Sequence, residues 1–157
     1  MPEPAPYRRI LALVHFDEHD GLVVGKASLL AQQNQAELVL LHLIEPDGGL
    51  DGGYFGGEVR TTARVLEQAA LRRLQFLAAT LGIDGARCDA QHGLRRQRLS
   101  QYIDHAHPDL IVAGEAHAYL VDACDTLILS PGKRPRGGHL LMAFLNWLGV
   151  RMRIAGV

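Results

Sequence analysis

The sequence predicts an α/β protein built as a three-layer, open parallel sheet with helices on its faces. Short apolar runs of strand length alternate along the chain with longer stretches in which apolar residues recur every three or four positions. The 157 residues are 48% hydrophobic and 21% charged, which suits one soluble globular domain. We expect a single domain over 1–157, with its core at about 7–131 and a C-terminal apolar extension at 132–157.

The first part of the chain predicts a β-α-β unit. Residues 10–16, ILALVHF, form a nearly continuous apolar run, as expected for a strand buried on both faces. Helical spacing begins at Asp20, and either Asp17 or Asp20 is expected to cap that helix. Residues 37–44, ELVLLHLI, predict a second strand. Because a single helix connects the two runs, the strands are expected to be parallel.

The remaining elements follow the same alternation. A glycine-rich stretch with six glycines predicts a flexible loop, because glycine gives the backbone too much freedom for a packed element. Gly82 is expected to end the second helix, and the His107-Pro108 pair the third. The predicted elements are the loop at 47–57, a helix over 59–81, a weaker edge-like strand over 86–92, a helix from 93 to 106, and strands over 109–114 and 125–131, separated by a short segment at 116–124.

Composition and charge exclude several classes of protein. A net charge of −1 argues against bulk binding of nucleic acid, which needs a basic surface. Cys88 and Cys124 are the only cysteines, so no disulfide framework is expected and a reducing cytoplasm fits. The first nine residues lack the layout of a signal peptide, and no apolar run reaches the ~20 residues that span a bilayer. We therefore expect a cytoplasmic protein without a transmembrane segment.

Four fragments in this order resemble the universal stress protein family. The resemblance extends over roughly residues 7–131 and implies a Rossmann- or flavodoxin-like fold with five strands in the order 3-2-1-4-5. It also implies a homodimer paired through the last strand. The fragments are YRRILALVHFDEHD at the first strand, LVLLHLIEP at the second, the helix led by Gly93 with the following HPDLIVAG, and DTLILSP near the end.

The resemblance separates this chain from the ATP-binding members of that family. Those members carry an aspartate after the first strand and a G-x-x-G, nine residues, G-S/T pattern after the fourth, where backbone amides approach the phosphates. Here His15 stands at the aspartate position, Gly114 matches the first glycine and His117 replaces the second. The final G-S/T pair of the pattern would fall on Leu127-Ile128, inside the expected fifth strand. The resemblance thus implies a stress-response or regulatory module without ATP, acting as a dimer or through protein partners.

An alternative is a small-molecule binding protein that takes a nucleotide or a related compound. Ligands of open α/β sheets bind beyond the carboxyl ends of the strands, where the strand order reverses. In the implied order this crevice lies between strands one and four. If the family's positions carry over, its lining is Val14, His15, Leu43, Gly114 and His117.

Histidines near the carboxyl ends of four strands raise a second alternative, a divalent metal site. Neutral imidazoles that converge on one cavity would suit zinc. However, these four have no HxxxH or HExxH spacing, and one in the second strand is explained equally well by a hydrogen bond inside the sheet. We therefore expect no cofactor, and no catalytic residues are recognised. The candidate ligands are His15, His42, His92 and His117.

The C-terminal tail contains a short segment, 139–149, that is apolar nearly all round and has arginines on both sides. Such a segment must be buried somewhere. It packs over its own sheet, exchanges with a partner subunit as part of a homodimer contact, or contacts a membrane surface peripherally. These three possibilities stay open.

Overall fold

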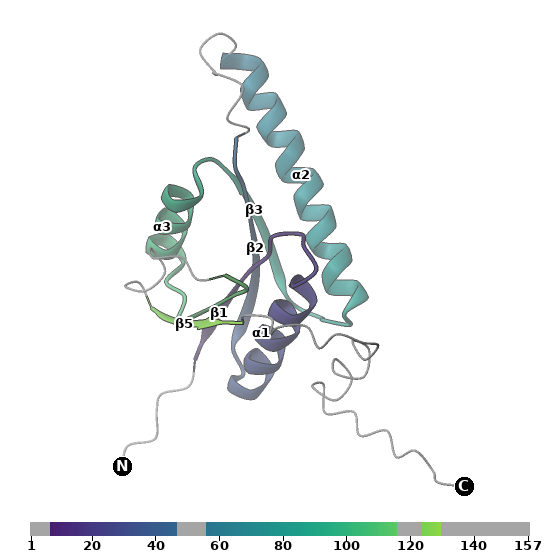
Figure 1. Cartoon of the computed structure of the whole chain (residues 1–157), viewed down its shortest axis with the longest axis vertical. Coiled ribbons are helices and arrows are strands. Elements are labelled where there is room, and N and C mark those ends of the chain that lie inside the picture. Colours follow the sequence, from purple (N-terminus) through teal and green to yellow (C-terminus); the bar gives the residue numbers. More distant parts are fainter. Residues whose placement is uncertain (1–6, 47–55, 116–123, 130–157) are drawn as a thin grey trace, which may run out of the picture.

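The computed structural model describes residues 7–46, 56–115 and 124–129, with the side chains of 56–61 left aside. Its strands form one parallel sheet in the order β3-β2-β1-β4-β5, which confirms the predicted fold class and strand order (Figure 1). The elements are β1 Arg9–Leu13, α1 Asp20–Asn34, β2 Glu37–Ile44, α2 Gly56–Thr80, β3 Arg87–His92, α3 Arg95–Ala106, β4 Leu110–Ala113 and β5 Asp125–Ile128.

The sheet is covered on both faces by helices. Alternate residues of β1 enter two different cores because successive side chains of a strand point to opposite faces. Ile10 and Ala12 pack with α1 and α2, whereas Leu11 and Leu13 pack with α3. Figure 1 shows the same arrangement, with α1 and α2 on one side of the sheet and α3 on the other. Burial on both faces explains why β1, β2 and β4 are such continuous apolar runs.

Local boundaries differ from the sequence-based expectation at two places. The predicted cap of α1 by Asp17 or Asp20 is wrong: His19 occupies the N-cap position and makes no side-chain capping bond. Asp20 is instead the first helical residue, and its carboxylate turns back towards the preceding loop. In addition, α2 begins at Gly56, inside the stretch that was expected to be a loop.

The predicted helix ends are confirmed where the backbone requires a left-handed residue. α2 ends at Thr80, and Gly82 follows with φ of 66°. α3 ends at Ala106, and His107 adopts φ of 47° just before Pro108. In both places the chain leaves the helix through the αL region, which glycine adopts without steric cost.

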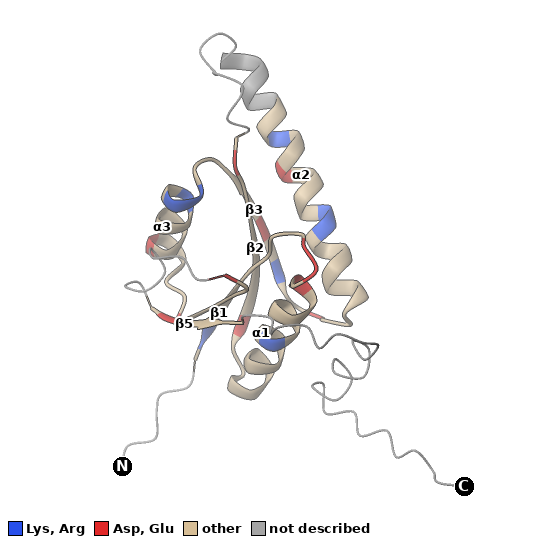
Figure 2. Cartoon of the chain, viewed as in Figure 1, with Lys and Arg blue, Asp and Glu red and all other residues tan. Residues whose placement is uncertain are grey.

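The part of the chain that the structure describes contains no helix long and apolar enough to cross a membrane. Positive and negative side chains are interspersed along it, and both signs occur on β3 (Figure 2). Several expectations lie outside the described residues: the position of His117, the C-terminal extension at 132–157 with its apolar segment 139–149, and most of the segment between β4 and β5.

Candidate functional site

The turn that follows β1 is organised by one buried carboxylate. Asp20 is 6% exposed, and its two carboxylate oxygens accept hydrogen bonds from the backbone amides of His15 (2.9 Å) and Asp17 (3.0 Å). Between these residues Phe16 adopts φ of 63°, which is uncommon for a non-glycine residue. Burial raises the pKa of Asp20, while the amides of His15, Phe16 and Asp17 act in the opposite direction. The carboxylate therefore fixes the turn in a single conformation.

The left-handed turn directs the Phe16 ring against two side chains from other elements. Its centroid lies 4.1 Å from that of His42 on β2, with the two rings tilted by 37°. The guanidinium carbon of Arg73 on α2 lies 4.3 Å from the centre of the same ring, within the range of a cation–π contact. Phe16 thus fills the space above the end of β1 on the face of the sheet that α1 and α2 cover.

His42 has the structural role that the sequence offered as one of its two explanations. Its Nδ1 lies 2.8 Å from the carbonyl oxygen of Val14, a geometry in which Nδ1 carries the proton and donates it. Burial is the main cause that lowers the pKa of His42, and nearby His15 lowers it further. The ring is therefore neutral near pH 7 and connects β2 to the end of β1.

His15 lies on the opposite face of the sheet, towards α3. It lines a cavity of about 10 Å³, roughly the space that one water molecule needs, together with Leu13, Val14, Leu41, Leu43, Arg95 and Leu99. Burial lowers the pKa of His15, and Arg95 at the start of α3 lowers it further. The acidic residues Asp17, Glu115 and Asp20 oppose this shift without reversing it.

The structure brings only part of the predicted crevice together. Val14, His15 and Leu43 line the same small cavity, as expected. Gly114 follows β4 and faces α1 instead: a Cβ atom placed on it would lie 3.6 Å from Val23 Cγ2 and 3.7 Å from His19 Cβ. That spacing is ordinary van der Waals contact, so the local packing does not require glycine. His117, the fifth predicted residue, lies outside the described chain.

The histidines of the proposed metal set do not form a ligand cluster among the residues described. No group of three or more His, Cys, Asp or Glu side chains in that part of the chain is arranged to hold a metal ion. His15 and His42 are near neighbours. His92 ends β3, where its amide donates to Glu67 of α2 at 3.0 Å.

Sequence reasoning missed three residues that shape this region. The sequence shows Phe16 only as the end of an apolar run and gives no sign that Arg73 or Arg95 lies nearby. Arg95 lines the cavity beside His15, and its Nε is buried without a hydrogen-bond partner among the described residues. The signal that was available is the DEHD stretch after β1, which marked a polar turn but not the inward direction of Asp20.

Comparison with known proteins assigns the family. The model of the universal stress protein family matches residues 6–122, about three quarters of the chain. The chain belongs to the universal stress protein family. A curated relative, universal stress protein D of Escherichia coli strain K12, is 24% identical over 114 residues, which cover 73% of this chain and 80% of the relative.

Solved structures of universal stress proteins have the same fold. UspA from Lactobacillus plantarum superposes with a TM-score of 0.61 at 21% identity, covering 80% of this chain and 99% of that one. A universal stress protein solved in complex with cAMP gives a TM-score of 0.55 at 17% identity, covering 80% and 98%. At these identities the similarity establishes the shared architecture.

Proposed function

We propose that this universal stress protein is a cytoplasmic stress-response module that binds neither ATP nor a metal and turns over no substrate. It acts as a homodimer or through protein partners. The observation that carries the proposal is the small space that the described residues leave at the end of β1, where the family resemblance implies the adenine contact. The cavity lined by His15 there is only about 10 Å³, and Phe16 packs against His42 and Arg73 on the opposite face.

The chemistry at the end of β1 also favours this proposal. A neutral imidazole at position 15, next to the Arg95 guanidinium, replaces the carboxylate that the family resemblance assigns to the adenine contact. The one carboxylate buried in the turn, Asp20, accepts hydrogen bonds from backbone amides. It is therefore occupied as a structural acceptor and is poorly placed to contact a base.

The position of the last strand supports the same conclusion. In the family pattern, the second phosphate-binding pair falls on Leu127-Ile128. These two residues belong to β5 and pair with Val112 and Ala113 of β4. Both residues are therefore part of a strand and do not lie in a loop at a helix N-terminus, which is where backbone amides usually gather around a phosphate.

Thermal unfolding of the full chain with millimolar ATP tests this proposal. A ligand that binds only the native state at 100 times its Kd stabilises it by about 2.7 kcal/mol. For a domain of this length that corresponds to a rise in Tm of about 5–10 °C. We expect no change in Tm with ATP or AMP, and no stoichiometric metal in the same sample. A clear ATP-dependent rise, lost in His15→Ala, would overturn the proposal.

A second candidate function is binding of a small nucleotide in the crevice near His15 and Gly114. The observation in its favour is the structural similarity to the universal stress protein solved with cAMP. The same titration with cAMP separates the two candidates. A rise in Tm with cAMP but not with ATP would favour this second function.

The homodimer part of the proposal rests on the sheet order. β5 lies at one edge of the sheet, and among the described strands it pairs only with β4. An unpaired edge is available for pairing with a second copy. Sedimentation at micromolar concentration is expected to give twice the 17.2 kDa chain mass. A monomer throughout that range would contradict it.

A further inference from the structure

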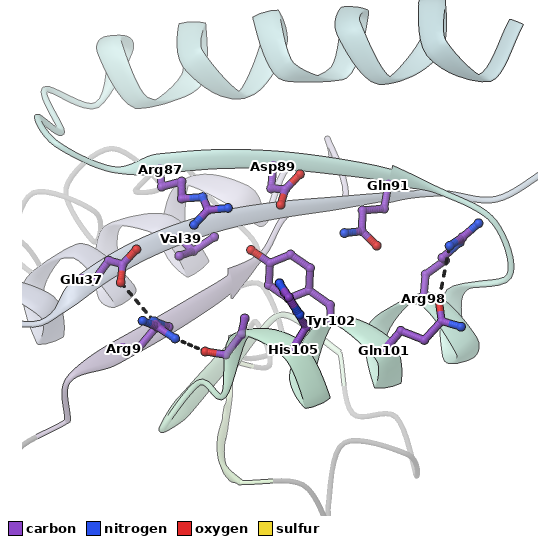
Figure 3. Close-up of a pocket in the computed structure, with 11 residues that line it drawn as sticks. Arg9, Glu37, Val39, Arg87, Asp89, Gln91, Arg98, Gln101, Tyr102 and His105 are labelled. Carbon is purple, nitrogen blue, oxygen red and sulfur yellow. Dashed lines mark hydrogen bonds and ion pairs between the residues drawn. The ribbon is translucent and has the colours of Figure 1, made fainter. Parts of the chain in front are cut away.

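A second, much larger cavity lies beside β3, away from the end of β1. It has a volume of about 600 Å³, within the range of small-molecule sites. Figure 3 shows side chains of β3 on one side of the cavity and of α3 on the other, with Arg9 of β1 and Glu37 and Val39 of β2 beside them. None of the predicted crevice residues lines it. The lining residues are Arg9, Glu37, Val39, Arg87, Asp89, Gln91, Arg98, Gln101, Tyr102, His105 and Ala106.

The alternation of β3 explains why this space stays open. Cys88 and Ala90 point towards α2, where Cys88 joins the apolar core and Ala90 is buried. Arg87, Asp89 and Gln91 are the intervening residues, so they share the face directed at α3. A helix cannot close tightly over three polar side chains, because they would lose water without gaining enough partners. The floor of the cavity is accordingly formed by β2 and α3, with Val39 and Tyr102.

The charges of the cavity favour an anionic ligand. Three arginines face two carboxylates, and most of these groups already have partners. Arg9 contacts Glu37 at 3.0 Å and donates to the carbonyl of Ala106. Arg98 donates to the carbonyl of His92 at 2.8 Å. Arg87 makes no hydrogen bond or ion pair with any residue in the described part of the chain. Its guanidinium is therefore the cation left to meet a ligand.

The remaining polar groups suit hydroxyl groups on the same ligand. Asp89 lines the cavity near Tyr102, and its carboxylate oxygens can accept hydrogen bonds from a ligand. The amide groups of Gln91 and Gln101 both donate and accept. The planar guanidinium of an arginine can donate two parallel hydrogen bonds to the oxygens of a phosphate. A phosphate monoester carries up to two negative charges, so a lining with net positive charge attracts it more strongly than it attracts a singly charged anion.

We propose that this cavity binds a small hydroxylated phosphate monoester of sugar-phosphate size, with the phosphate on Arg87 and the hydroxyls on Asp89, Gln91 and Gln101. The site does not depend on the function proposed for the crevice at His15. It shares no residue with that crevice, so either one can fail without the other.

The test is titration of the full chain with ribose 5-phosphate, followed by calorimetry and by amide chemical shifts. We expect saturable binding at up to millimolar concentration, with shifts at β3 and α3 and none at His15. Inorganic phosphate and ribose should bind about tenfold more weakly or worse, because each lacks one half of the contacts. No saturation at millimolar ribose 5-phosphate would overturn the proposal. Equally tight binding of inorganic phosphate, which lacks the hydroxyls, or of gluconate, which lacks the phosphate, would overturn it too.

The variants locate the ligand. Arg87→Gln should weaken binding by about tenfold or more, the usual loss for a hydrogen bond to a charged group. Arg96→Gln is the matched control: Arg96 is exposed on α3 and does not line the cavity, so affinity should not change. Equal affinity of Arg87→Gln and wild type would refute the assignment. If Arg87→Gln melts early, Gln91→Ala takes its place, with the same expected direction.

Discussion

The same helix, α3, closes one part of the sheet and leaves another part open. Near the end of β1 it packs Leu99 onto leucines of β1 and β2, and about 10 Å³ of space remains. Beside β3 it presents Arg98, Gln101 and Tyr102 to a polar strand face, and about 600 Å³ remains. Leu99 and Tyr102, which belong to the two regions, are less than one turn apart on this helix. The two regions differ in the strand side chains that face α3, which are leucines on β1 and β2 but polar residues on β3.

This difference shows that the side chains on the strands, and not the strand order, decide how much space remains beneath α3. At the end of β1, where the family resemblance implies the adenine contact of ATP-binding members, the described residues leave a cavity of about 10 Å³. A separate opening appears where an edge strand carries charged residues on its inner face. Substitutions in the two regions, and the dependence of stability on pH, test whether the closed region is packed and whether its polar groups are structural.

The largest effect is expected at the closed region, for Leu99→Ala. Leu99 is 1% exposed, and truncating such a leucine removes apolar contacts and leaves a cavity. We expect a loss of about 3 kcal/mol in the free energy of unfolding, measured by urea denaturation. Tyr102→Phe is the comparison at the open region and should cost about 1 kcal/mol or less, because it removes only the hydroxyl group and keeps the buried ring. Similar losses for the two variants would remove the contrast between the regions.

A smaller effect is expected for Asp20→Ala, which tests the turn after β1. The substitution leaves the amides of His15 and Asp17 without their acceptor, and we expect a cost of about 2 kcal/mol. Asp17→Ala is the matched control because the Asp17 carboxylate is exposed and accepts from the amide of His19. It should cost about 0.5 kcal/mol. If Asp20→Ala were as stable as Asp17→Ala, the buried carboxylate would not be organising the turn.

The smallest effect is a loss of stability in mild acid. The pKa values of His15 and His42 are lowered in the fold, mainly by burial, so both rings bind protons more readily when the chain is unfolded. Stability is therefore full above the unfolded pKa of 6.5 and falls as the pH drops through the lowered folded values. The raised pKa of Asp20 acts in the opposite direction, because its protonation relieves the cost of burying the charge.

Urea denaturation between pH 7 and pH 5 measures this dependence. The double variant His15→Gln, His42→Gln should lose less stability over that range than the wild type. An unchanged slope would mean that other groups carry the acid sensitivity.

Sequence alone predicted most of the fold because burial on both faces leaves a clear pattern. β1, β2 and β4 are continuous apolar runs, and no other element of that length fits them. The alternation of β3 identified an edge strand. It did not reveal the cavity, because period-2 alternation shows that one face is polar without showing whether that face meets water or a helix.

The candidate site was less predictable for a physical reason. The inward direction of Asp20 depends on the left-handed backbone of Phe16, and phenylalanine gives no sign of that conformation. The contact between Phe16 and Arg73 depends on how α2 packs beside the end of β1. Both features arise from contacts between distant segments. The family resemblance placed His15 and Leu43 at the crevice, but nothing in the sequence marked Phe16 and Arg73 as residues that pack beside it.

The position of β1 in the middle of the sheet has a consequence for how the protein is made. β1 pairs on one side with β2, which follows soon after it, and on the other side with β4. The amide of Arg9 reaches Asp109, 100 residues further along the chain. During synthesis the central strand therefore keeps one exposed edge until most of the domain has left the ribosome. Pairings at such long separation fold slowly, and an open strand edge attracts other chains. The nascent chain is thus most vulnerable to aggregation before β4 has been translated.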